Sequence, residues 1–156
     1  MTRRYGRSPV GQRLVCPVPQ GHYQTTTMIA AVRLQGPQVP WLFDGPMDGE
    51  LFLAWVKQGL APALQRDDVV ILDNLSTHKV VGVREAIEAA GARLEYLPPY
   101  SPDLNPIEPL WSKVKQGLKR HDPRTARQLF QAAGAAFDTV TRKDCRGFFL
   151  HAGYAT

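Results

Sequence analysis

Two carboxylates occupy positions from which they could share a metal ion. Asp73 follows the apolar run Val69–Leu72, which is expected to form a buried strand, and Glu108 falls in the first turn of a later expected helix. Thirty-four residues separate the two acids. A carboxylate at the end of a strand, joined by another from a later helix, can bind the Mg²⁺ used in phosphoryl transfer. The pairing therefore predicts a nuclease-type catalytic site.

The chemistry expected at such a site is the transfer of a phosphodiester between two oxygens. Two divalent ions ~3.5–4 Å apart can hold the attacking and the leaving oxygen. Because hard cations prefer carboxylate oxygens, we expect Asp73 to bridge both ions and Glu108 to hold one of them. The expected cofactor is Mg²⁺ or Mn²⁺, and the two carboxylates should lie within about 8 Å of each other at one edge of the sheet.

Each of these residues also has an ordinary structural interpretation. Asp73 could cap a turn at the end of its strand, and Glu108 could be an acid stabilised by the helix dipole. Asn74 could orient Asp73 or a phosphate, or simply form the turn. His78 and Lys79 could contact DNA, or they could be a partly exposed histidine and a solvated lysine. Taken singly, these residues leave both interpretations open.

Two longer blocks carry more information. The first block is Leu72–Lys79 and the second is Leu97–Glu108, with Trp111 and Lys115 beyond it. Both blocks resemble the mariner-like superfamily of DDE transposases, in particular those of bacterial insertion sequences, and their separation matches the family's spacing between its second and third acids. The resemblance implies an enzyme that cuts DNA at element ends and joins them to a target with magnesium or manganese.

The resemblance also implies that part of the family's domain is missing. The family's first catalytic aspartate lies on a strand before a stretch that corresponds to Arg4–Arg7, and Met1 comes after that point. Asp44 and Asp48 lie in a turn-like cluster and are not expected to replace it. We therefore expect an N-terminally truncated, inactive catalytic domain. The alternatives are a catalytically silent remnant that binds DNA or pairs with an intact transposase, and a nuclease that only hydrolyses DNA.

Composition agrees with a polyanionic partner. The chain has 156 residues, enough for one domain over 1–156, and 19 Lys and Arg against 14 Asp and Glu give a net charge of +5. One basic cluster contains Arg3, Arg4, Arg7 and Arg13, and another contains Lys113, Lys115, Lys119, Arg120, Arg124 and Arg127. Such residues either form a solvated face or contact the DNA backbone, which would make binding dependent on salt.

Other compositional signals point to an intracellular protein without a membrane segment. Cys16 and Cys145 form no Cys-x-x-Cys pair, and the four histidines lack metal-finger spacing. No leader and no apolar run of about 18 residues is present, so we expect a cytoplasmic protein with free thiols.

The order of predicted elements is that of an α/β domain. We expect a hairpin from 25–32 and 39–43, a helix from 49 to 62, a strand at 69–72, a helix over 80–90 and a parallel strand at 93–97. Helices capped by Asn105 and Thr125 should follow, and then a short segment around 145–149. Through the resemblance, this order implies an RNase H-like fold, a mixed sheet flanked by helices, whose first, central strand is missing.

Overall fold

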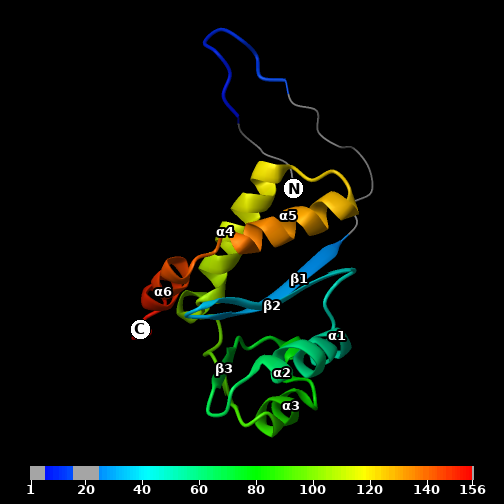
Figure 1. Cartoon of the computed structure of the whole chain (residues 1–156), viewed down its shortest axis with the longest axis vertical. Helices are drawn as coiled ribbons and strands as arrows, with labels where there is room; N and C mark the ends of the chain where they lie inside the picture. The colour runs from blue at the N-terminus through cyan, green and yellow to red at the C-terminus, as the bar shows by residue number, and fades with distance from the viewer. Residues whose placement is uncertain (1–5, 16–24, 156) are drawn as a thin grey trace.

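The computed structural model of the protein describes residues 6–15 and 25–155 (Figure 1). A β-hairpin opens the main body of the chain. β1 (Thr26–Arg33) pairs antiparallel with β2 (Gly36–Asp44). The β-branched and apolar residues of both strands favour this pairing. The register shifts between Ile29 and Ala31, which marks a β-bulge. The predicted hairpin is therefore confirmed.

One continuous helical run follows the hairpin. It consists of α1 (Gly49–Trp55), the π-helical turn η1 (Val56–Leu60) and α2 (Ala61–Ala63). Asp48 caps its start by accepting a hydrogen bond from the Leu51 amide at 2.8 Å, which is a structural role for this acid. Trp55 is 2% exposed and its Nε1 donates to the Val39 carbonyl at 3.0 Å. This confirms the predicted helix and places its apolar stripe in the core.

A strand, a helix and a second strand form the next unit. β3 (Val69–Leu72) and β4 (Arg93–Tyr96) pair in parallel, as predicted. Between them lie η2 (Ser76–Lys79), a 3₁₀ turn, and α3 (Val83–Ala89). The helix begins three residues later than the start predicted at 80, because Gly82 adopts a φ of 96° that belongs to the left-handed region.

Three helices complete the chain. After η3 (Pro102–Leu104) come α4 (Ile107–His121), α5 (Ala126–Asp138) and α6 (Arg142–His151). Pro109 lies in the first turn of α4 without interrupting it, because a proline there lacks only an amide hydrogen that the first helical turn leaves unpaired anyway. The short segment predicted around 145–149 is wrong in extent, since α6 is a full helix.

Two apolar clusters lie on opposite faces of the hairpin. Ile29 of β1 packs with Phe52 and Trp55, in a cluster that also contains Leu94 of β4. The neighbouring residue Ala30 packs on the other side, with residues of α4, α5 and α6. Alternate residues of β1 therefore face different helical layers, as expected for a strand buried on both sides.

The four strands do not form one sheet. β1 and β2 make one two-stranded sheet, and β3 and β4 make another. Because residues of β1 and β4 share one apolar cluster with Phe52 and Trp55 of α1, both sheets pack against this helix. The interruption lies between β1 and β3, where no backbone hydrogen bond joins the two strands within the described residues.

One prediction about β3 is wrong, and the interruption of the sheet explains why. The run Val69–Leu72 was expected to be buried on both sides, yet Val69 is 44% exposed and the three residues after it are only half-buried. The physical reason is that one edge of β3 faces an open space instead of another strand.

Candidate functional site

A cavity of about 680 Å³ separates β1 from β3. Its sides are formed by residues 27–33 of β1 and residues 69–73 at and beyond β3. Asp73 and Glu108 both line this cavity, together with His78 and Asn105. The structure thus places both predicted metal ligands at one cavity. That their carboxylates lie within about 8 Å of each other stays a prediction.

Asp73 is held by its own turn. It follows β3 directly, and its Oδ1 accepts a hydrogen bond from the Leu75 amide at 3.2 Å. This is an Asx-type turn, so the structural interpretation of Asp73 applies, and its catalytic role stays a prediction. The side chain nevertheless remains 38% exposed, which leaves it accessible to a ligand.

His78 lies beside Asp73 instead of on the open surface. Its Nδ1 is 2.6 Å from Oδ1 of Asp73, but the approach does not have the geometry of a hydrogen bond. The imidazole packs against Phe52, with ring centroids 4.3 Å apart, and only 18% of the side chain is exposed. The Tyr96 hydroxyl donates to the His78 carbonyl at 3.0 Å. These contacts fix the ring against the carboxylate.

The neighbouring residues of the first block differ in their exposure. Oδ1 of Asn74 is buried and accepts no hydrogen bond from any described residue. Lys79 is exposed, and its Nζ lies 5.8 Å from the centre of the Tyr96 ring. This unpaired amide oxygen, in the residue after Asp73, is a hard oxygen ligand of the kind that divalent cations bind.

Glu108 is placed by the start of α4. Asn105 caps this helix as predicted, since its Oδ1 accepts from the Ile107 amide at 3.3 Å and its carbonyl accepts from the Glu108 amide at 3.1 Å. Glu108 is therefore exposed in the first helical turn, at the positive end of the helix dipole.

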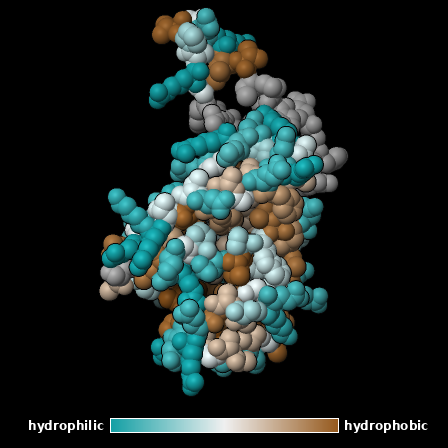
Figure 2. Space-filling view, viewed as in Figure 1, coloured by the Kyte–Doolittle hydropathy of each residue, from teal (hydrophilic) through white to brown (hydrophobic). Residues whose placement is uncertain are grey.

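The predicted DNA-binding cations occupy different settings. Lys115 is exposed on α4, and Arg7 is exposed in the projecting segment 6–15, whereas Arg3, Arg4 and Cys16 lie outside the described residues. Lys113 instead lies 2.6 Å from Asp144 of α6, and its ammonium group, together with hydrogen bonds from Thr141, lowers the pKa of Asp144 to about 2. Figure 2 shows hydrophilic residues over the end of α4 and the start of α5.

The acidic side chains at the cavity are of the type that binds a hard divalent cation, but they are few. Asp73 and Glu108 offer the carboxylate oxygens that Mg²⁺ and Mn²⁺ prefer. Across residues 6–15 and 25–155, however, no three His, Cys, Asp or Glu side chains gather closely enough to hold a metal ion.

The thiol of Cys145 belongs to the core beneath α4, where burial raises its pKa. Within the described parts of the chain, no helix is long and apolar enough to cross a membrane.

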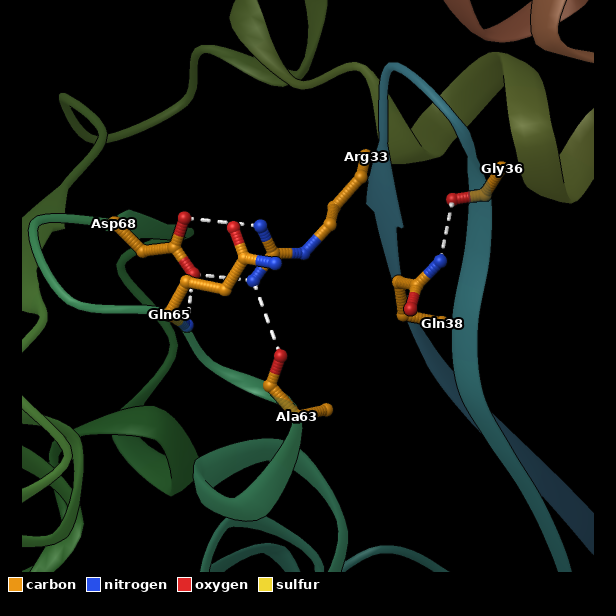
Figure 3. A network of polar contacts seen from close by, with 6 residues as sticks. All are labelled: Arg33, Gly36, Gln38, Ala63, Gln65 and Asp68. Carbon is orange, nitrogen blue, oxygen red and sulfur yellow. Dashed lines mark hydrogen bonds and ion pairs between the residues drawn. The ribbon is translucent and has the colours of Figure 1, made fainter.

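Sequence reasoning missed the polar contact that crosses the interruption of the sheet. Arg33, the last residue of β1, forms two hydrogen bonds with the Asp68 carboxylate, which precedes β3, and one of them measures 2.9 Å (Figure 3). The guanidinium also donates to the Ala63 carbonyl at 3.3 Å. The two partners are 35 residues apart, so no local pattern could have paired them.

Comparison with known proteins identifies both a family and a fold. Residues 1–130 match the DDE superfamily endonuclease family. The Mos1 strand transfer complex matches with a TM-score of 0.74 at 18% identity, over 96% of this chain and 47% of that chain. The Mos1 mariner paired-end complex with Mn matches with a TM-score of 0.75 at 16% identity, over 97% and 49%.

These matches confirm the predicted α/β, RNase H-like fold. A pre-cleavage Mos1 transpososome also matches, with a TM-score of 0.69 at 14% identity, over 99% of this chain and 52% of that chain. The chain spans about half the length of these solved chains. No curated protein matches it by sequence.

Proposed function

The chain belongs to the DDE superfamily endonuclease family, and we propose that it forms part of a transposase catalytic domain, over residues 1–156, for metal-dependent DNA cleavage and strand transfer. The observation that carries this proposal is that Asp73, at the end of β3, and Glu108, in the first turn of α4, both line one cavity. Two carboxylates presented by rigid elements can position a divalent ion for phosphoryl transfer.

In this proposal Mg²⁺ or Mn²⁺ supplies charge stabilisation for the two phosphodiester oxygens. Asp73 and Glu108 would hold the ion, the unpaired oxygen of Asn74 belongs to the residue after Asp73, and the His78 imidazole lies against the Asp73 carboxylate. The Mn in the Mos1 paired-end complex supports the choice of metal. Because no three His, Cys, Asp or Glu side chains among the described residues gather closely enough to hold a metal ion, we expect little or no cleavage by this chain on its own.

The proposed partner is DNA, at both the element ends and the target. The Mos1 complexes are paired-end and strand transfer complexes, and this chain carries a net charge of +5. Lys79, Lys115 and Arg7 are exposed and suited to phosphate contacts, whereas Lys113 would have to leave Asp144 first. Origin from a bacterial insertion sequence, a cytoplasmic location, and pairing with a second copy or with a full-length transposase belong to the same proposal.

Binding of Mn²⁺ tests the site directly. We expect weak binding, measured by electron paramagnetic resonance of free Mn²⁺, that Asp73→Asn and Glu108→Gln each reduce about tenfold or more. Asp103→Asn is the matched control, because this exposed acid lies in the same Leu97–Glu108 block but does not line the cavity. Binding that survives both substitutions, or no binding at millimolar Mn²⁺, would contradict the assignment.

The alternative of a silent remnant makes a different prediction about activity. Both readings allow DNA binding, so affinity cannot separate them. A longer version that adds an upstream strand with a carboxylate should cleave DNA with Mg²⁺, and Asp73→Ala or Glu108→Ala in that version should abolish cleavage while binding stays intact. A restored protein that binds DNA and metal but never cleaves would favour the remnant. A product that is nicked but never joined would favour simple hydrolysis.

A further inference from the structure

The loop that joins β4 to η3 carries a fully exposed aromatic ring. Tyr100 has a relative exposure of 102%, whereas Phe130, the other exposed Phe, Tyr or Trp of the described residues, has 43%. Tyr96 and Tyr154 are half-buried, and each donates its hydroxyl hydrogen to a backbone carbonyl. A ring that lies wholly in solvent buries no apolar area in the folded chain. The face of the Tyr100 ring is therefore open to a ligand.

The backbone at Tyr100 holds a conformation that tyrosine rarely adopts. Its φ is 58°, in the left-handed region that glycine and asparagine adopt at lower cost. One proline precedes it directly and another follows two residues later, and their fixed φ angles restrict the loop. The far end of the loop is anchored, because the Tyr154 hydroxyl donates to the Leu104 carbonyl at 3.0 Å. Strain of this kind, held by its surroundings, is concentrated at ligand sites.

The loop connects the two elements that present the predicted metal ligands. Its first residue, Leu97, donates its amide hydrogen to the carbonyl of Leu72 at 2.8 Å, and Leu72 directly precedes Asp73. Glu108 follows the loop in the first turn of α4. Because β3 and β4 run parallel, the segments that follow them leave the same edge of the sheet. Tyr100 thus belongs to the edge at which Asp73 lies.

Other exposed apolar side chains accompany the ring in these two segments. Leu75, in the turn of Asp73, is 56% exposed, and Leu104 is 38% exposed. A phosphate backbone is bound by cations and hydrogen-bond donors, whereas aromatic and apolar surfaces suit the face of a nucleobase. A paired base shows only its edges in the grooves of a duplex, so its face becomes available when the base is unpaired.

We propose that Tyr100 is a stacking platform for an unpaired nucleobase of the DNA strand at the predicted site. This inference rests on the proposed function for its ligand, but it needs neither the metal nor the two acids. Stacking tolerates any sequence, because every base has a π face. The binding preference that results is for unpaired over paired DNA.

Two DNAs of equal length test this preference. One is a fully paired duplex, and the other is a forked duplex whose strands are not complementary at one end, so both carry the same number of phosphates. Measured by fluorescence anisotropy at one salt concentration, the chain should bind the forked duplex about tenfold more tightly. A third DNA, with the same fork but with abasic arms, should bind like the paired duplex. Equal affinity for the first two DNAs, or a preference that the abasic arms retain, would overturn the proposal.

Tyr100→Asn is the test variant, because asparagine tolerates the left-handed conformation but has no aromatic ring. It should lose the preference for the fork and bind the paired duplex within about twofold of the unsubstituted chain, with an unchanged dependence on salt, since stacking releases no counterions. Tyr100→Trp should retain the preference. Phe130→Gln is the matched control, because it removes an exposed ring from α5 and should also retain the preference.

Three results with Tyr100→Asn would contradict a stacking role. These are a preference for the fork that persists, an equal loss of affinity for both DNAs, and unfolding at a clearly lower urea concentration, which would show that the ring supports the fold.

The Mn²⁺ experiment separates this proposal from the catalytic one. If Tyr100 decides the preference for the fork but Mn²⁺ binding does not depend on Asp73 and Glu108, the stacking platform stands and the metal-site proposal fails. If Mn²⁺ binding depends on both acids but the fork is not preferred, the stacking proposal fails alone. No binding to any of the three DNAs at low salt would overturn the stacking platform and the DNA partner together.

Discussion

The contact of Arg33 with Asp68 should contribute measurably to stability. The substitution Arg33→Met removes the guanidinium but retains most of the apolar stem. The side chains of Arg33 and Asp68 are 27% and 21% exposed, so the pair lies between a surface pair worth ~0–1 kcal/mol and a buried one that costs ~3–5 kcal/mol to break. Its two hydrogen bonds to one carboxylate favour the middle of that range. We expect a loss of about 1.5 kcal/mol in the free energy of unfolding.

The pH dependence of this loss follows from the carboxyl group. The hydrogen bond from Arg33 is the largest cause that lowers the pKa of Asp68 below its ordinary value of 3.8. A carboxyl with a lowered pKa stabilises the folded state above its unfolded pKa, and this contribution disappears as pH falls through the folded pKa. The difference between Arg33→Met and the unsubstituted chain should therefore be full at pH 7 and should shrink below pH 3.8.

Urea unfolding at several pH values measures both effects. A double-mutant cycle with Asp68→Asn should give a coupling of about 1 kcal/mol at pH 7. Arg84→Met is the matched control, because Arg84 and Glu88 form an ion pair whose side chains are 49% and 50% exposed, so its loss should stay below about 0.5 kcal/mol. Zero coupling, or a loss from Arg33→Met that persists unchanged at pH 2, would refute this account of how the two sheets are held together.

Two further predictions concern the lysines of α4. Lys115→Met should weaken binding to arbitrary duplex DNA and reduce the slope of log K against log salt by about one, measured by fluorescence anisotropy; an unchanged slope would exclude Lys115 from the interface. Lys113→Met should cost about 1 kcal/mol in stability after allowance for solvent screening. Because the pKa of Asp144 is lowered to about 2, this contribution should be present above pH 3.8 and disappear as the pH falls through about 2. Urea unfolding at several pH values measures it. A loss of stability from Lys113→Met that is the same above pH 3.8 as below pH 2 would contradict the ion pair.

Local patterns were sufficient to predict most of the regular elements. The alternation in β1, the apolar run of β3 and the caps at Asn105 and Thr125 each depend on residues close together in sequence. The helix α6 was missed although Thr141 and Asp144 form a capping box, a local signal that the sequence does contain. Its low burial explains the miss, since Cys145 is the one buried residue of this helix.

At the site, the sequence could not predict features that depend on contacts between residues far apart in the chain. The spacing of Asp73 and Glu108 indicated a shared site, and the structure places both on one cavity. The sequence did not reveal that the imidazole of His78 turns inward, because that depends on its packing against Phe52, 26 positions earlier in the chain. A histidine in a short 3₁₀ turn can point to solvent or to the core, and only tertiary contacts decide between them.

The exposure of β3 connects these observations. Four consecutive apolar residues without alternation are typical of a strand covered on both sides, and yet Val69 is 44% exposed and its neighbours are half-buried. Burying the remaining apolar surface would be favourable by ~25 cal/mol per Å², and a neighbouring strand would also satisfy the free edge. The composition of β3 is thus suited to a neighbour that the described chain does not supply. An apolar run that stays exposed in the folded state is itself a sign that a sheet is incomplete, and here it adjoins Asp73.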